Sequence, residues 1–197
     1  MRRIGLTGGI GSGKSTLGHL LQEKGLPLID ADAISRQLTQ AGGEAIEPLQ
    51  QVFGPQCFDA SGGLDRAHMR QLVFTNQDAK HRLQQVLHPL ILFQIEKQVQ
   101  ACQATGNSLV VLDIPLLVES SHWRARVDRV LVVDCEEETQ VHRVMQRSQL
   151  SAQAVQHIMA NQASRHQRLA AADIVIYNND NNMTHLRHQV DQLDLHI

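Results

Sequence analysis

The 197-residue sequence has few aromatic side chains, few cysteines and no large excess of charge of one sign. Aromatic residues make up 3% of the chain and the formal net charge is −2. Proteins that bind nucleic acid usually carry a basic face or aromatic stacking platforms, so nucleic acid is not an expected partner. Cys57, Cys102 and Cys135 are far apart and outside any C-x-x-C spacing, which is typical of reduced thiols in a cytosolic protein.

Long apolar segments are also lacking. Met1-Arg2-Arg3 leads directly into a short apolar run and a glycine loop, and no segment is of signal-peptide or membrane-spanning type. We therefore expect a cytoplasmic protein without membrane contact. A chain of this length with 42% hydrophobic residues can form one full core, so a single domain with an inserted lobe is expected.

Five short apolar runs, each ending near a polar residue or glycine, are typical of buried parallel strands. They span residues 3–7, 26–30, 108–113, 129–134 and 173–177, and helical segments such as 15–24 and 137–149 separate them. This alternation predicts a doubly wound α/β fold with a five-stranded parallel sheet. Ligands of such sheets bind beyond the carboxyl ends of the strands. One crevice is therefore expected to be lined by Thr7-Gly8, Asp30, Asp32 and Asp113.

Between the second and third predicted strands lie about 75 residues without a convincing strand, far more than one crossover needs. Apolar residues recur there at helical spacing, as at Leu83, Val86, Leu87, Leu90, Ile91 and Ile95. We expect an inserted helical lobe that overhangs the crevice and binds the second substrate. Residues 183–195 are expected to form a final amphipathic helix.

Residues 8–15, Gly8-Gly9-Ile10-Gly11-Ser12-Gly13-Lys14-Ser15, match the pattern G-x-x-x-x-G-K-[ST] between a predicted strand and a predicted helix. The glycines let the backbone turn tightly and point its N–H groups inward, which makes a cradle for phosphate at a helix N-terminus. Lys14 is expected to reach the β- and γ-phosphates, and the Ser15 hydroxyl to bind Mg²⁺. The alternative is a glycine-rich turn that caps a helix and binds nothing.

Aspartates follow the second and third predicted strands. Phosphoryl transfer to a hydroxyl needs a group that accepts its proton, and Asp32 is the candidate base. The alternative is that Asp30 or Asp32 caps a helix expected to begin at Ala33. Asp113 is a candidate for holding magnesium through water or for positioning the acceptor, and its alternative role is to satisfy the loop backbone.

Arginines are grouped in the last third of the chain. Arg143 and Arg147 share one face of a predicted helix, and Arg165 and Arg168 follow. A mobile lid carrying these arginines could close over a triphosphate. The alternative is a solvated face whose arginines pair with residues 136–138. The eleven histidines form no cluster with cysteine that suggests a metal site.

Several further segments occur in a specific order. They are Leu6 to Thr16, Ile29-Asp30-Ala31-Asp32, Phe53-Gly54, Leu64-Asp65-Arg66, Leu87-His88-Pro89, Asp113-Ile114-Pro115-Leu116-Leu117-Val118-Glu119, Ala172-Asp173 and Asn178. With these segments the chain resembles the dephospho-coenzyme A kinase family from Leu6 to about Asn179. The phosphate loop is generic to many folds, but the aspartate pair, the His-Pro and the Asp-x-Pro-Leu-Leu-x-Glu segment in this order are not.

The resemblance implies that ATP phosphorylates the ribose 3′-hydroxyl of dephospho-coenzyme A, with Mg²⁺ as cofactor, in the last step of coenzyme A synthesis. It implies that Asp32 is the base, and Lys14 and Arg143 are further catalytic candidates. The implied ATP site comprises Gly9, Gly11, Ser12, Gly13, Lys14, Ser15, Thr16, Arg147 and Asn178, with Ser15 and water on magnesium. The implied acceptor site comprises Asp32, Arg66, His88, Asp113, Leu116, Leu117 and Glu119.

The resemblance also implies three parts: a P-loop core of about residues 1–32, 108–136 and 168–197, a helical substrate lobe of about 33–107, and a lid of about 137–167. A monomer or weak homo-oligomer is expected. Tyr177 departs from the acidic residue that the family often has at this position.

Two alternatives stay open. One is a P-loop kinase that acts on a nucleoside monophosphate or another small hydroxyl compound. The other is a regulatory GTPase, against which the sequence argues because Asp113-Ile114-Pro115-Leu116 lacks the glycine of D-x-x-G and no N-K-x-D occurs.

Overall fold

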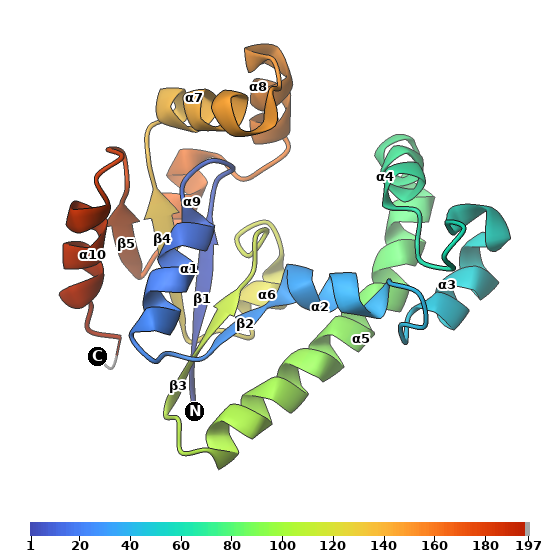
Figure 1. Ribbon diagram of the computed structural model, residues 1–197, viewed down its shortest axis with the longest axis horizontal. Coiled ribbons are helices and arrows are strands. Elements are labelled where there is room, and N and C mark those ends of the chain that lie inside the picture. The colour runs from blue at the N-terminus through green and yellow to red at the C-terminus, as the bar shows by residue number, and fades with distance from the viewer. Residues whose placement is uncertain (196–197) are drawn as a thin grey trace. The chain divides into compact units, whose positions relative to one another are not determined.

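The structure, a computed structural model, describes residues 1–195 and divides into two compact units (Figure 1). The larger unit comprises Met1–Asp30 and the chain from Cys102 onward, and it contains the sheet. The smaller unit, Ala31–Ala101, is helical. Within residues 1–195 no helix is both long enough and apolar enough to cross a membrane.

The sheet is parallel and has five strands, which confirms the predicted fold class. The strands are β1 (Arg2–Gly8), β2 (Leu28–Asp30), β3 (Leu109–Asp113), β4 (Arg129–Asp134) and β5 (Ile174–Tyr177). Their order is β2-β3-β1-β4-β5. In the register, Leu6 of β1 and Asp30 of β2 are both partners of Asp113 of β3. The carboxyl ends of these three strands therefore share one edge of the sheet, as the crevice prediction requires of Gly8, Asp30 and Asp113.

Helices surround the sheet in the larger unit. They are α1 (Lys14–Glu23), α6 (Ser121–Arg124), α7 (Glu137–Ser148), α8 (Ala152–Ala160), α9 (Arg165–Ala171) and α10 (Met183–Asp191). Helices α1 and α10 cover the same face, where their apolar residues pack with alternate residues of the strands (Figure 1). The packed set includes Ile4, Leu6, Leu17, Leu20, Leu21, Val111, Leu131, Val133, Leu186 and Val190. The burial of apolar side chains from both ends of the chain thus fixes the position of α1, which begins at the phosphate loop.

The smaller unit consists of α2 (Ala31–Leu38), α3 (Ile46–Phe53), the short 3₁₀ helix η1 (Pro55–Cys57), α4 (Arg66–Thr75) and all but the last turn of α5 (Gln77–Ala104), which ends in the larger unit. Phe58 and Leu64 of this unit form an isolated antiparallel bridge. The expectation of a helix beginning at Ala33 was wrong, because α2 begins at Ala31 directly after β2. Asp32 therefore lies inside the first turn of the helix rather than at its N-cap, and its charge suits the helix dipole there.

Candidate active site

The loop between β1 and α1 has the backbone of a phosphate cradle. Gly11 and Gly13 have φ values of 77° and 93°, in the left-handed region that glycine tolerates best. A Cβ atom on Gly13 would lie 2.2 Å from the side-chain nitrogen of Asn178. Glycine is thus required at position 13 both by its backbone conformation and by the close approach of another loop.

The loop after β5 is attached to the phosphate loop by two side chains. Asn178 donates its amide N–H to the Ser12 carbonyl at 2.8 Å. Arg143 of α7 donates to the carbonyls of Asn178 and Asp180, each at 2.8 Å, and has longer contacts of 3.4 and 3.5 Å to the Gly11 and Ser12 carbonyls. Arg143, which the sequence suggested as a lid residue, is thereby held within the larger unit.

These residues border a pocket of about 180 Å³ beside the start of α1. Its lining includes Gly13, Thr16, Arg143, Asn178, Asn182 and Met183. Thr16 and Asn178, both predicted ATP-site residues, therefore lie at one pocket with Arg143. Arg147 lies exposed in the last turn of α7, away from this lining.

Lys14, the first residue of α1, forms an ion pair with Asp113 at the end of β3. The side chains of Lys14 and Asp113 are 18% and 8% exposed, so both groups have lost much of their water. The pair places a cation and a carboxylate at the carboxyl edge of the sheet beside the phosphate loop. Ser15, the next residue, is exposed in the first turn of α1.

The connection between α8 and α9 contacts the phosphate loop, which sequence reasoning did not foresee. The backbone N–H of Ile10 donates to the side-chain oxygen of Gln162 at 3.0 Å. Arg168 of α9 is buried, and a Cβ atom on Gly9 would lie 2.7 Å from its guanidinium. Burial lowers the pKa of Arg168. The Gln162 contact has no sequence signal, because Gln162 stands 152 positions from Ile10 and belongs to no motif, whereas Arg168 was among the arginines expected near the phosphates.

Arg165 pairs with two carboxylates of the larger unit. Its Nε and Nη2 atoms donate to Asp134 at 2.9 and 2.8 Å, and its Nη1 atom donates to Glu136. These hydrogen bonds raise the pKa of Arg165. The pKa of Glu136 is lowered, mainly by the hydrogen bond that it accepts from Arg165. Tyr177 donates its hydroxyl to Glu136 at 2.9 Å. For Arg165 the structure shows the pairing that was the alternative to a lid role.

The Asp113–Glu119 segment contains residues of different exposure. Leu116 is 49% exposed, whereas Leu117 is fully buried and would support an acceptor site only through packing. A Cβ atom on Gly5 of β1 would lie 2.6 Å from Leu117, which shows how closely that side chain packs on the sheet. Glu119 accepts a hydrogen bond from the Ala163 N–H at 2.7 Å and so anchors the α8–α9 connection.

The remaining acceptor candidates belong to the helical unit. Asp32 is exposed in the first turn of α2, and Arg66 is the first residue of α4. His88 lies half-buried in α5, followed by Pro89 within the same helix. Arg66 donates to the hydroxyl of Thr39 at 2.7 Å.

Solved structures share this fold. A crystal structure from Thermus thermophilus has a TM-score of 0.85 and 31% identity, and the match covers 96% of this chain and 93% of that one. Shikimate kinase from Acinetobacter baumannii has a TM-score of 0.53 at 16% identity, a likeness of fold alone. The parallel sheet and the glycine loop before α1 define the class as a P-loop nucleotide-binding protein.

The family model for dephospho-CoA kinase matches residues 2–184. A dephospho-CoA kinase from Bordetella pertussis is 53% identical over 178 residues, covering 90% of this chain and 82% of the relative, and one from Albidiferax ferrireducens is 45% identical over 195 residues, covering 99% and 92%. The Campylobacter jejuni dephospho-CoA kinase structure has a TM-score of 0.72 at 27% identity and covers 98% of this chain and 96% of its own. The chain belongs to the dephospho-CoA kinase family.

Membership of this family makes the chain an enzyme, a kinase that uses ATP as co-substrate. It confirms the resemblance inferred from the sequence. Neither a nucleoside monophosphate kinase nor a regulatory GTPase is favoured.

Proposed function

We propose that this protein transfers the γ-phosphate of ATP to the ribose 3′-hydroxyl of dephospho-CoA, giving CoA and ADP in the last step of CoA synthesis. The observation that carries the proposal is the phosphate loop at the sheet edge, with Lys14 and Asp113 paired beside it. Such a loop supplies positioning and charge for phosphoryl transfer, and the family supplies the acceptor.

The ATP phosphates would be held by the backbone N–H groups of residues 9–16. When ATP binds, Lys14 would leave its ion pair with Asp113 and bind the β- and γ-phosphate oxygens instead. The exchange is possible because the carboxylate and the phosphates are both anionic and lie near the start of α1. Asn178 and Arg143 would hold the phosphate loop next to the pocket that would bind the adenine ring. Arg147 would contact the nucleotide if residues 137–167 act as a lid.

Mg²⁺ fits this site through the exposed hydroxyl of Ser15 in the first turn of α1. Among residues 1–195 no group of three or more His, Cys, Asp or Glu side chains is arranged to hold a metal, so the ion would be bound mainly by phosphate oxygens and water. When bound, it would neutralise charge on the transferred phosphoryl group. Asp113 would orient one of its water ligands or the acceptor.

Asp32 is the proposed base. Its carboxylate would take the proton of the 3′-hydroxyl as that oxygen forms a bond to the γ-phosphorus, while the bond between this phosphorus and the bridging oxygen breaks and ADP leaves. Arg66, His88, Leu116 and Glu119 are proposed to shape the acceptor site, with Leu117 packing beneath it. The domain proposal is a core of about 1–32, 108–136 and 168–197, with a substrate lobe of about 33–107.

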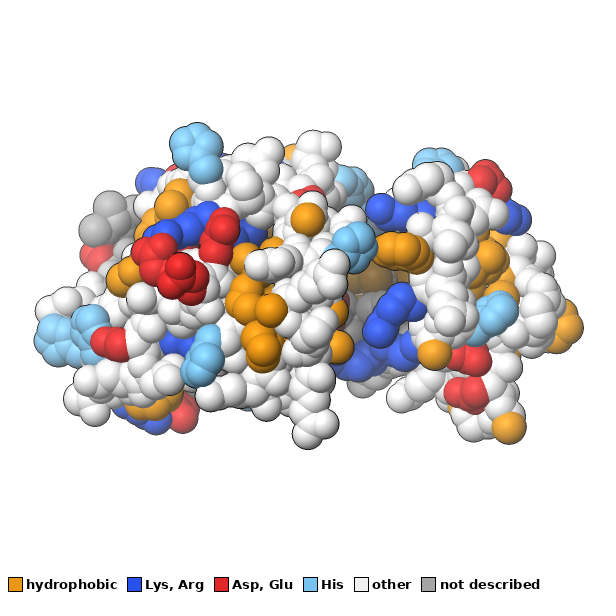
Figure 2. All heavy atoms as spheres, turned by 90° about the horizontal axis from the view of Figure 1, so that it is seen from above, with side chains coloured by type: hydrophobic (Ala, Val, Ile, Leu, Met, Phe, Trp, Pro, Cys, Tyr) orange, Lys and Arg blue, Asp and Glu red, His pale blue; other side chains and the backbone are white. Residues whose placement is uncertain are grey.

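The partners proposed are small molecules. On the face drawn in Figure 2, acidic and basic side chains of the larger unit, at the left, lie next to one another rather than forming a surface of one sign. Mixed charge does not attract a polyanion over a long surface. We propose a cytoplasmic enzyme that is a monomer or a weak homo-oligomer.

The test is to incubate the pure protein with MgATP and dephospho-CoA and to follow ADP and CoA. ADP formation should depend on dephospho-CoA, and the product should gain one phosphate by mass spectrometry. Nucleoside monophosphates as acceptors and GTP as donor should give lower kcat/KM values. Acceptor-independent ADP formation alone, or a preference for a nucleoside monophosphate, would contradict the proposal.

A further inference from the structure

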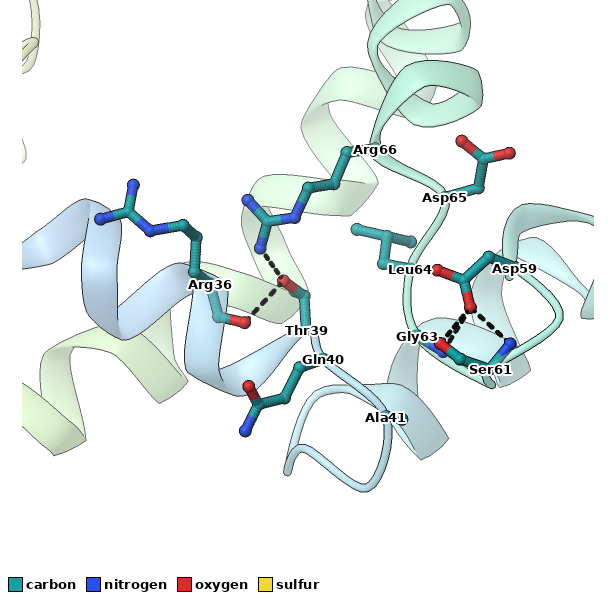
Figure 3. A pocket seen from close by; sticks show the side chains of 10 residues that line it. All are labelled: Arg36, Thr39, Gln40, Ala41, Asp59, Ser61, Gly63, Leu64, Asp65 and Arg66. Carbon is teal, nitrogen blue, oxygen red and sulfur yellow. Dashed lines mark hydrogen bonds between the residues drawn. The ribbon is translucent and has the colours of Figure 1, made fainter.

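The helical unit contains a pocket of about 520 Å³ between the end of α2, the turn at residues 59–64 and the start of α4 (Figure 3). This volume lies in the range of pockets that hold small molecules. In Figure 3 the guanidinium groups of Arg36 and Arg66 lie at one end, and the carboxylates of Asp59 and Asp65 at the other. Nothing in the sequence motifs pointed to Arg36.

Backbone hydrogen bonds hold the walls of this pocket in place. The N–H of Leu64 donates to the Thr39 carbonyl at 2.9 Å, which joins the turn to the end of α2. The N–H of Asp65 donates to the Cys57 carbonyl at 2.9 Å, and that of Asp59 to the Gly63 carbonyl at 2.8 Å. The pocket is therefore formed before any ligand enters, which lowers the entropic cost of binding.

Thr39 fixes the position of the Arg66 guanidinium. The Thr39 side chain is buried, its hydroxyl donates to the Ser35 carbonyl at 2.7 Å, and it accepts from Arg66 at 2.7 Å (Figure 3). One nitrogen of the Arg66 guanidinium is thus anchored on Thr39, the residue directly after α2. Arg36 lies in the last turn of α2, so the end of this helix positions both guanidinium groups, that of Arg66 through its bond to Thr39.

The two carboxylates of the lining are bonded to nearby backbone. Asp59 accepts from the N–H and hydroxyl of Ser61 at 2.8 and 2.5 Å, and the hydrogen bond from the Ser61 side chain is the main cause that lowers its pKa. Asp65 is the N-cap of α4 and accepts from the N–H groups of Ala67 and His68 at 3.0 and 2.9 Å. Both carboxylates already have donors, so an incoming anion would meet the arginine end of the pocket.

We propose that this pocket binds the diphosphate of dephospho-CoA, with Arg36 and Arg66 as its cationic contacts. The inference rests on the proposed function. The diphosphate between adenosine and pantetheine is the only anionic group of that acceptor, whereas the triphosphate of ATP belongs to the phosphate loop. Planar guanidinium groups bind phosphate oxygens through paired hydrogen bonds, and two of them match the two phosphates of the acceptor.

Calorimetric titration of dephospho-CoA into Arg36→Ala, Arg66→Ala and the wild type tests this assignment. Arg70→Ala is the matched control, because Arg70 is an exposed arginine of the same helix α4 that lines a different surface. Each pocket variant should weaken binding of dephospho-CoA about 10- to 100-fold, while Arg70→Ala should leave it unchanged. The KM for ATP should stay constant in all three variants, and melting curves should confirm that they fold.

Inorganic pyrophosphate and adenosine serve as second probes. Adenosine lacks the diphosphate, so its binding should not distinguish the variants from the wild type. Unchanged affinity for dephospho-CoA in both pocket variants would overturn the assignment. Weaker binding of pyrophosphate alone would also overturn it, because the pocket would then be a site for free phosphates. A wild type that binds dephospho-CoA but forms no CoA would instead contradict the proposed function, so the two failures are separate.

Discussion

The backbone N–H of Ile10 donates to the side-chain oxygen of Gln162 at 3.0 Å, which joins the phosphate loop to the connection between α8 and α9. N–H groups of such a loop are the donors that bind phosphate oxygens. An amide oxygen is a neutral acceptor, so Gln162 stands where an anionic oxygen would make a stronger hydrogen bond. Phosphate binding through Ile10 would therefore displace Gln162.

Replacing Gln162 with alanine should tighten ATP binding about 2- to 10-fold, because the Ile10–Gln162 hydrogen bond would no longer have to be broken. The range corresponds to the net free energy of one hydrogen bond. Titration of a non-hydrolysable ATP analogue measures the change. Gln156→Ala, an exposed glutamine of α8, is the control and should bind as the wild type does. Weaker binding by Gln162→Ala would show that this side chain contacts the nucleotide instead of competing with it.

Lys14→Ala should lower kcat/KM about 100- to 1,000-fold, since it removes the cation that we propose stabilises charge on the transferred phosphoryl group. The substitution also removes the ion pair between Lys14 and the partly buried carboxylate of Asp113, which should lower the melting temperature. Steady-state kinetics and thermal melting measure the two effects. The double variant Lys14→Ala/Asp113→Asn separates them, because it should regain stability without regaining turnover. Recovered turnover would mean that Lys14 acts mainly on folding.

Asp32→Asn should reduce kcat by about 100-fold or more while the affinity for ATP changes little, as expected for loss of a base that acts on the acceptor. Single-turnover kinetics and ATP titration measure the two quantities. Asp30→Asn is the informative comparison, because Asp30 is the last residue of β2 and lies two positions before Asp32. If Asp30→Asn lost turnover and Asp32→Asn kept it, Asp30 would be the base.

Tyr177 should titrate above the ordinary tyrosine pKa, because its hydrogen bond to Glu136 favours the neutral phenol. It is the only tyrosine in the chain, so the ultraviolet absorbance of tyrosinate reports this residue alone. Glu136→Ala should lower the pKa of Tyr177 toward the ordinary value of 10.0, and Glu138→Ala should not.

The sign of the associated stability effect follows from the direction of the shift. Because the pKa of Tyr177 is raised in the folded chain, the hydrogen bond stabilises the protein below the pKa of the unfolded chain, and this stabilisation is lost as pH rises through the folded-state pKa. The difference in melting temperature between the wild type and Glu136→Ala should therefore become smaller at high pH, where only the loss of the Arg165–Glu136 ion pair remains. A constant difference across that range would contradict this linkage.

The strands could be predicted from the sequence because a parallel sheet buries both faces of its inner strands. All residues of β3 are buried, so the strand reads as a continuous apolar run that ends in Asp113. The edge strand β2 was predicted to begin at residue 26, but it begins at Leu28. Pro27 lacks an N–H and takes part only through its carbonyl, which accepts from Val111 at 2.8 Å.

The contacts around the phosphate loop could be predicted only in part. The motif gives Lys14 and Ser15 directly, since their chemistry depends on local spacing. The spacing of Arg143 and Arg147 suggested only that they lie in or beside a lid, whereas the bonds of Arg143 to Asn178 and Asp180 depend on how α7 packs near β5. Such contacts come from packing between distant segments, which a single sequence does not encode as a local pattern.

Gly13 leaves room for the Asn178 amide, which bonds to the phosphate loop. Arg143 also bonds to both the phosphate loop and the loop after β5. The loop after β5, proposed to contact the nucleobase, and the loop proposed to bind the phosphates are thus hydrogen-bonded to each other. ADP is therefore expected to dissociate in one step, in which the contacts to its adenine ring and to its phosphates break together.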